Sequence, residues 1–281
     1  MNYITLFGSG IAYAVLAFFF MWLAKKVADT RVTDEFDANY EIEENSNLAL
    51  ALRRGGLYLG IAIGMLGALS GTSTGFWKNV QELLIDGALV TGFIFVAFYI
   101  NNWVIVHGLD NDEAVRNRNR AVGVVECGSY VATGLIAYGS FTGEGGGIGS
   151  AVAFFALGQV ALLIIVALYE FITPFDVIKN VRDGNTAAGL MLAGMIVALA
   201  FVINASVTGD FRGWSQDLTS FVVSVGMGIF LLLLFTWPID KLFLPGTTIQ
   251  KEIERDKNVA AIAVTVSVRL ALALVIGAII V

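Results

Sequence analysis

The chain has 281 residues, of which 57% are hydrophobic and only 14% are charged, and its mean hydropathy is +0.77. Soluble domains carry charge on about a quarter of their residues, so this composition indicates an integral membrane protein whose first partner is the lipid bilayer. A formal net charge of -6 argues against a nucleic-acid partner, because phosphate binding requires a basic surface.

Catalytic and metal-binding signatures are missing from the sequence. One cysteine and one histidine exclude an internal disulfide and argue against a metal site. The chain has no P-loop, no GxSxG or HExxH motif and no paired intramembrane aspartates. We therefore expect no enzyme activity, no catalytic residues and no cofactor.

Eight apolar runs have the length of about 20 residues that a membrane-spanning helix needs. They lie at residues 4–23, 48–70, 84–106, 121–141, 148–172, 187–207, 218–237 and 259–281. Runs of this length are too long for barrel strands, and the backbone must satisfy its own hydrogen bonds in lipid. The predicted fold class is an all-α membrane protein with eight transmembrane helices.

The basic residues predict an orientation for these helices. All 17 lysines and arginines except Lys78 and Arg212 lie in or beside the loops joining spans 1 and 2, 3 and 4, 5 and 6, and 7 and 8. The positive-inside rule places these loops in the cytoplasm and both termini outside. The glycine-rich loop at 142–150 is typical of a flexible joint, here between two four-helix halves, 1–143 and 144–281, of one continuous membrane domain.

An internal repeat begins every even-numbered span with the motif Asn-x-Ala. The asparagines are Asn47, Asn119, Asn185 and Asn258, which lie 72, 66 and 73 residues apart. Each copy holds two spans, so all four enter from the same side as parallel two-helix repeats related by an axis along the membrane normal.

The repeated asparagines suit helix N-caps, because their side-chain oxygens accept hydrogen bonds from unpaired backbone N–H groups. Arginine stands three residues before the asparagine in the last three copies, as Arg116, Arg182 and Arg255. Four helix N-termini with these arginines at one face would also attract anions.

Each even-numbered span carries a stripe of small residues at positions +2, +9 and +13 from its asparagine. The residues are Ala49, Gly56, Gly60, Ala121, Gly128, Ala132, Ala187, Gly194, Ala198, Ala260, Ser267 and Ala271. At 100° per residue these positions share one face of a helix. Small residues let helix backbones approach closely in membranes, so the stripe predicts a packing surface.

Polar residues lie opposite the stripe, at positions +7 and +11, in three of the four copies. They are Arg54, Tyr58, Glu126, Tyr130, Thr265 and Arg269, whereas the third copy has Leu192 and Ile196 there. An Arg or Asp at the centre of a span costs roughly 2.5 to 3.5 kcal/mol on insertion scales, so such groups face protein or water.

Two interpretations of this polar face stay open. One is a structural pair of Arg54 with Glu126 between hairpins, with Arg53 extending to the membrane surface. The other is a cytoplasm-facing polar vestibule, in which Glu126 binds a cation or proton while Arg54 and Arg269 set the electric field.

Several segments at the cytoplasmic end have simpler interpretations. The stretch 29–44 holds seven acidic residues and is a solvated loop, or else it docks a basic cytoplasmic partner or concentrates cations. Residues 247–257 are expected to form a short amphipathic helix along the inner surface.

Asn101 and Asn102 lie near the inner end of the third span and are interpreted as solvated. Pro174 and Pro238 are expected to end or bend the fifth and seventh spans.

A family resemblance rests on the stretch TPFDVIKNVRDGNTAAGLMLAGMIVALAF at 173–201, echoed by IQKEIERDKNVAAIAV at 249–264. These stretches resemble the YjfL-like bacterial inner-membrane proteins, classed as domain of unknown function 350, and the chain looks like two members in tandem. The first copy departs most, with Glu44 in place of the arginine. The resemblance implies a multi-pass bacterial inner-membrane protein and supplies no activity.

The sequence leaves two hypotheses about function. The first is a transporter or channel-like protein that moves a small ion or charged solute through the vestibule; the second is a non-catalytic membrane scaffold or accessory subunit that recruits partner proteins. Parallel repeats and short outer loops favour transport, whereas the lack of helices broken at mid-membrane favours a scaffold. Related proteins of half the length would have to pair to complete the same bundle, so this chain is expected to be a monomer or a homodimer.

Overall fold

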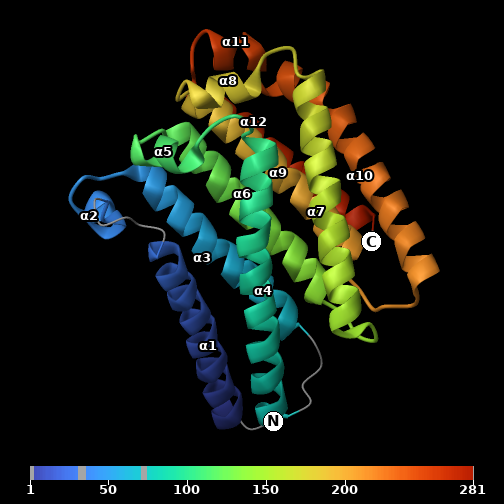
Figure 1. Cartoon of the computed structure of the whole chain (residues 1–281). Helices are drawn as coiled ribbons and strands as arrows, with labels where there is room; N and C mark the ends of the chain where they lie inside the picture. Colours follow the sequence, from blue (N-terminus) through green and yellow to red (C-terminus); the bar gives the residue numbers. More distant parts are fainter. Residues whose placement is uncertain (1–2, 31–35, 71–74, 281) are drawn as a thin grey trace.

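The computed structural model describes residues 3–30, 36–70 and 75–280, which are built of α-helices (Figure 1). The long helices are α1 (Tyr3–Asp29), α3 (Leu48–Leu69), α4 (Phe76–Ile105), α6 (Arg120–Phe141), α7 (Gly147–Ile172), α9 (Thr186–Val207), α10 (Trp214–Phe243) and α12 (Val259–Ile279). The short helices are α2 (Ala38–Glu43), α5 (Asn111–Arg116), α8 (Val177–Arg182) and α11 (Ile249–Glu254). Eight helices in the described ranges are long and apolar enough to cross a membrane, which confirms the predicted fold class.

Each repeat consists of a long outer helix, a short helix and a long inner helix. The short helices begin after capping residues whose side chains accept hydrogen bonds from backbone N–H groups of the first turn: Asp37, Asp110, Asp176 and Thr248. The short helix predicted at 247–257 is confirmed as α11, but its counterparts α2, α5 and α8 were not predicted. In Figure 1 the helices α5, α8 and α11 gather at one end of the molecule, where three inner helices start.

The four repeated asparagines start the inner helices as predicted, since each side-chain oxygen accepts an N–H group of the first turn. The same side chains also reach the next repeat. Asn47, Asn119 and Asn185 each donate Nδ2 to the carbonyl of the fifth residue of the following short helix. The three acceptors are Val115 O at 3.1 Å, Val181 O at 3.1 Å and Ile253 O at 2.8 Å. We call this bond the inter-repeat latch.

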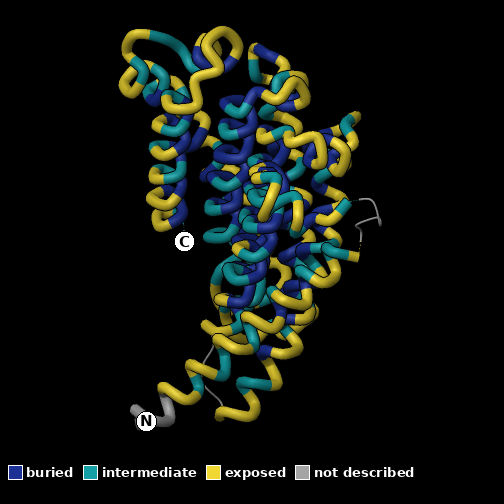
Figure 2. Tube along the Cα trace, turned by 90° about the vertical axis from the view of Figure 1, so that its left-hand side faces the viewer, coloured by how far each residue is buried: buried dark blue, intermediate teal, exposed yellow. Residues whose placement is uncertain are grey.

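The inner helices α3, α6, α9 and α12 pack side by side in chain order, and the outer helices α1, α4, α7 and α10 pack against this row. The two middle helices of the row, α6 and α9, are the most buried spans. Figure 2 shows the buried residues concentrated in the interior of the molecule. The predicted small stripe mediates this packing at three interfaces. A Cβ atom added to Gly56 would lie 2.6 Å from Cys127 Cα, and one added to Gly128 would lie 2.8 Å from Ala193 Cβ. On α12 the stripe is exposed instead.

Three helices are at least seven residues longer than the apolar runs predicted, among them α1, which has 27 residues against the run 4–23. Helices α4 and α10 have 30 residues each, whereas the runs cover 84–106 and 218–237. Polar residues such as Lys78 and Asp217 end an apolar run without ending the helix, because backbone hydrogen bonds do not depend on side-chain polarity. Pro238 lies inside α10, which continues to Phe243, so it does not end that helix. Pro174 follows the end of α7, as expected.

The glycine-rich loop between the halves is held against the loop that follows α9. Glu144 N donates to Asp210 Oδ1 at 2.9 Å, and Phe211 N donates to Glu144 O at 2.9 Å. Gly143 has φ 101°, and a Cβ there would lie 2.1 Å from Gly209 O. The row of inner helices continues across the predicted boundary at 143/144, since α6 packs on α9.

Replacing a glycine within the row tests how much the close backbone packing stabilises the fold. A Cβ at Gly134 would lie 2.3 Å from Gly60 O, so we expect Gly134→Ala to lower the free energy of unfolding by about 1 to 3 kcal/mol through overpacking. The thermal midpoint of the purified protein in detergent measures this loss. Gly92→Ala on α4 is the control, because a Cβ there meets no atom within 4 Å. Equal midpoints for the two variants would contradict the prediction.

Candidate functional site

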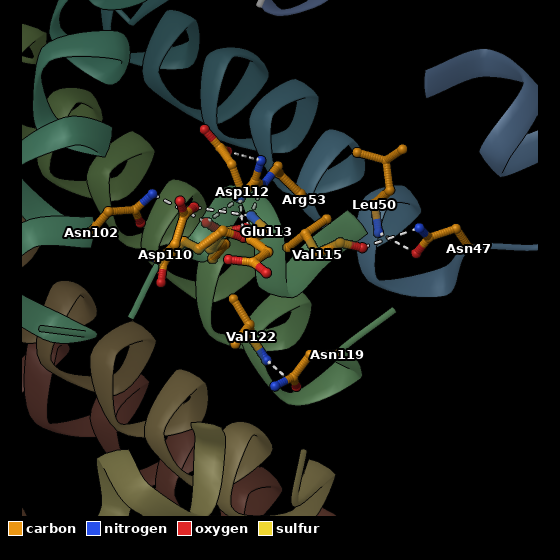
Figure 3. A network of polar contacts seen from close by, with 12 residues as sticks. Asn47, Leu50, Arg53, Asn102, Asp110, Asp112, Glu113, Val115, Asn119 and Val122 are labelled. Carbon is orange, nitrogen blue, oxygen red and sulfur yellow. Dashed lines mark hydrogen bonds and ion pairs between the residues drawn. The ribbon is translucent and has the colours of Figure 1, made fainter. Parts of the chain in front are cut away.

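The most buried charged group of the spans is Glu126 on α6, whose side chain is 0% exposed. Arg53 on α3 binds both carboxylate oxygens, with Nε 2.5 Å from Oε2 and Nη2 2.8 Å from Oε1. Asn102 on α4 donates Nδ2 to Oε1 at 3.1 Å. Three helices thus converge on one carboxylate, and Figure 3 labels two of the contributing side chains, Arg53 and Asn102.

Arg53 also joins this carboxylate to the short helix α5. Its Nη1 donates to Asp112 Oδ1 at 2.5 Å and its Nη2 donates to Asn111 O at 3.0 Å, as Figure 3 shows for Asp112. The guanidinium carbon lies 5.6 Å from the centre of the Phe98 ring, within range of a cation–π interaction. We call Arg53, Glu126, Asn102 and Asp112 the charge cluster.

The predicted pair of Arg54 with Glu126 is wrong by one residue. Arg53 takes the place expected of Arg54, which instead donates to Asp29 and, at 2.8 Å, to Asn39 Oδ1. One residue turns the direction of a helical side chain by 100°, so position +6 of α3 faces α6 while position +7 faces α1 and α2.

The other residues of the predicted vestibule divide between two places. Arg54 and Tyr130 line a cavity of about 70 Å³ together with Arg53, Asp112 and Arg116. Tyr130 stacks on Phe98 with ring centres 4.9 Å apart, and Tyr58 is half-buried on α3.

Thr265 and Arg269 belong to α12, on the far side of α9 from the charge cluster. Thr265 donates to Ile262 O within its own helix. Arg269 is 2% exposed and its Nη1 lies 3.6 Å from Met191 Sδ and 3.9 Å from Met195 Sδ. Successive inner helices step along a row instead of surrounding an axis, so equivalent positions face successive interfaces and do not meet.

A line of buried polar residues continues from the charge cluster toward the middle of the spans. Asn101 donates Nδ2 to Ser129 Oγ at 2.9 Å and to Thr133 Oγ1 at 3.3 Å. All three are buried, so the interpretation of Asn101 as solvated is wrong. From Glu126 to Thr133 the line covers about 10 Å of helix. Glu126, Ser129 and Thr133 are positions +7, +10 and +14 from Asn119, and this spacing in the sequence indicates that they share one face of α6.

Two of the buried amides beside the charge cluster keep unused hydrogen-bonding capacity. Asn101 Oδ1 and both polar atoms of the Asn111 side chain are buried and make no hydrogen bond within the described part of the chain. Unpaired buried polar groups are costly, and a hydrogen-bonding guest such as water or a small polar solute would satisfy them.

An open groove of about 860 Å³ lies at the opposite end of the spans. Acidic side chains line it, among them Glu82, Asp86 and Asp210. Phe141 belongs to its wall and packs on Phe93, with ring centres 6.0 Å apart. Thr133 and Phe141 are about 12 Å apart along α6, so aromatic rings lie between the groove and the buried polar line.

The arginines before the helix starts have three different surroundings. Arg116 lies with its guanidinium carbon 5.0 Å from the Phe36 ring centre, Arg182 approaches His107 O at 3.5 Å, and Arg255 makes two 2.8 Å bonds to Asp256. Anion binding at the helix starts stays a prediction.

The acidic segment 29–44 is described in part, because residues 31–35 lie outside the described residues. Asp29 pairs with Lys25 and Arg54, and Glu41 lies 3.4 Å from Arg118. In the described ranges no group of three His, Cys, Asp or Glu side chains could hold a metal ion.

At the next interface of the row, apolar residues occupy the positions that correspond to Arg53 and Glu126, and they suggest a pair of substitutions. Positions +6 and +7, which Arg53 and Glu126 occupy at the α3–α6 interface, are Val125 and Leu192 at the α6–α9 interface, both buried. We expect Glu126→Leu alone to cost about 3 to 5 kcal/mol of unfolding free energy, because Arg53 loses its buried partner. Adding Arg53→Val should restore most of it, since an apolar pair packs as well.

Unfolding in detergent, followed for both single variants and the double variant, measures this coupling. The exposed ion pair of Arg255 with Asp256 is the control, because the coupling between exposed groups is small. Additive losses from the two single variants would show that the pair is not coupled.

The chain is similar in sequence to two transmembrane proteins. A "UPF0719 transmembrane protein" from Aquifex aeolicus is 23% identical over 243 residues, which cover 85% of this chain and 88% of the relative. The "UPF0719 transmembrane protein YshE" from Bacillus subtilis is 26% identical over 128 residues, which cover 44% of this chain and 90% of the relative. No solved structure matches the chain.

A family model, described as Domain of Unknown Function (DUF350), matches the chain twice. The matched segments are residues 2–141 and 144–280, and each contains two of the four repeats. The protein is an integral membrane protein that belongs to the DUF350 family and carries two family domains in tandem.

Proposed function

We propose that this protein moves a small ion or small charged solute across the bacterial inner membrane, with Glu126 as the group that binds a proton or cation. The observation that carries the proposal is the fully buried carboxylate of Glu126, paired with the partly buried Arg53, at an interface whose neighbour packs with Val125 and Leu192. Because an apolar pair serves the same packing role, the charges are not required to build the row, and buried charge is costly. Intramembrane ionisable groups commonly mark ion or proton paths.

The surroundings of Glu126 would allow a proton or cation to replace Arg53 as the partner of its carboxylate. A proton or cation that reaches Glu126 would compete with Arg53, and Asp112 is already bonded to the same guanidinium and can keep it. The cavity of about 70 Å³ lies on the α5 side of the pair, and the buried polar line leads away from it. Both termini are expected outside, so this cavity would open toward the cytoplasm.

The aromatic rings between the polar line and the groove fit a closed state of such a path. Phe93 stacks on Phe155 with ring centres 4.5 Å apart and also packs on Phe141. Passage would require these rings to separate, as expected for a transporter that opens alternately to its two sides.

Flux into proteoliposomes tests the proposal, with protons, potassium, spermidine and small anions offered in turn. We expect wild-type flux of a cation or of protons and its loss in Glu126→Gln, because the amide cannot exchange a charge. Glu254→Gln, on the exposed side of α11, is the matched control and should keep the flux. A single cooperative thermal transition well above the assay temperature would show that each of the three proteins is folded, even where the midpoint of Glu126→Gln is lower.

A role as a membrane scaffold or accessory subunit is the second candidate. The observation that favours it is the pair of exposed carboxylates at the end of α2, where Glu43 is the last residue of the helix and Glu44 is its C-cap, because a basic cytoplasmic partner could reach both. Folded wild-type protein without flux for every solute would favour this role over transport. Capture of a partner that Glu43→Lys with Glu44→Lys abolishes would then support it.

A further inference from the structure

The row of inner helices uses two different faces of each helix. The forward face is the small stripe at positions +2, +9 and +13, and it packs on the rear face of the next inner helix at positions +4, +8 and +15. The rear-face residues in the last three copies are Gly123, Cys127, Gly134, Gly189, Ala193, Ala200, Ile262, Val266 and Ala273. A head-to-tail contact of this kind leaves one forward face and one rear face unused at the ends of the row.

The unused forward face belongs to α12. Its residues Ala260, Ser267 and Ala271 are all exposed, whereas the nine residues at the same positions of α3, α6 and α9 are all buried. The exposed stripe of α12 consists of small side chains, as the buried stripes do.

The unused rear face belongs to α3, at the other end of the row. Its residues are Ala51, Gly55 and Ala62, and all three are only half-buried. A Cβ added to Gly55 would meet no atom within 4 Å, whereas the equivalent residues Cys127 and Ala193 lie against the preceding helix. This face is built from small residues as well, so it matches the forward face of α12.

The inter-repeat latch is incomplete at the same two ends. Asn258 is exposed and donates Nδ2 to Glu252 Oε2 of its own repeat at 2.7 Å, and not to a carbonyl of another short helix. The acceptor equivalent to Val115, Val181 and Ile253 in the first repeat is Ile42 O, and no preceding asparagine reaches it from the described residues.

We propose that a second copy of this chain docks head to tail, with the forward face of α12 in one copy on the rear face of α3 in the next. In this pairing Ser267 meets Gly55 as Gly56 meets Cys127 within the chain, and Asn258 of one copy can reach Ile42 O of the other. The interface continues one that the chain already builds three times.

Membrane physics favours this occupant over lipid. Lipid supplies no hydrophobic drive for helix association, so helices pair through close van der Waals packing and polar bonds. Both are available here, from two small faces and one asparagine amide. A head-to-tail contact repeats until it closes, so it yields a ring about the membrane normal or a longer row of copies.

Disulfide cross-linking in native membranes tests the pairing. In a Cys127→Ala background, Ser267→Cys is placed on a chain with one affinity tag and Gly55→Cys on a chain with another, and both are expressed together. Alanine at 127 repeats the residue at the equivalent position, Ala193. Oxidation should link the two differently tagged chains, because the corresponding positions within the chain are in direct contact.

The control pairs Gly55→Cys with Val222→Cys, whose residue on α10 is 66% exposed and lies outside both faces. Cross-linking no stronger than in this control would overturn the proposal. Links between two Ser267→Cys chains in place of the mixed pair would also overturn it, since they indicate a symmetric contact.

A second measurement does not depend on cysteine chemistry. Ala271→Trp should convert assemblies of the purified protein to the 30.1 kDa monomer without lowering the thermal midpoint, because the residue is exposed within one chain. Wild-type protein that is already monomeric in lipid nanodiscs, or an unchanged assembly in Ala271→Trp, would contradict head-to-tail docking.

Discussion

Close backbone packing between successive inner helices is the interaction on which the rest of this structure depends. Inside a bilayer, helices gain little from excluding lipid, so they hold together where small residues let their backbones touch and where polar groups bond across the interface. Gly60 against Gly134 provides the first of these conditions, and the latch from Asn185 to Ile253 O provides the second. One asparagine per repeat therefore starts an inner helix, and in the first three repeats it also binds the next repeat.

A row, unlike a ring, gives each interface its own surroundings, and the chain uses the three interfaces differently. The first holds the Arg53–Glu126 pair, the second packs Val125 and Leu192, and the third buries Arg269 among methionine sulfurs. The row of inner helices forms with all three kinds of side chain, so the packing of an interface does not dictate which polar or apolar groups it contains. Function is best sought where the chemistry departs from what packing needs, and the first interface departs most clearly.

The two ends of the spans also differ. The end with the short helices holds several arginines, the carboxylates that cap the short helices, and the charge cluster at which the buried polar line starts. The other end has an open acidic groove. Two family domains in one chain allow the two halves to differ in sequence, which a pair of identical half-length chains could not do. The charge cluster lies within the first domain and has no charged counterpart in the second.

The sequence by itself determined the eight helices, the four parallel repeats, the asparagine caps and the small packing stripe, because each depends on composition or on periodicity along one helix. Two weaker local signals went unused: Asp110 and Asp176, which cap short helices, and the shared face of Glu126 and Thr133. Only the tertiary structure decided that Arg53 and not Arg54 meets Glu126, and that Arg269 lies at a separate interface. A helical wheel gives the direction of each side chain relative to its own helix. Which neighbour lies in that direction depends on how the helices are arranged, and four helices in a row offer different neighbours from four helices around an axis.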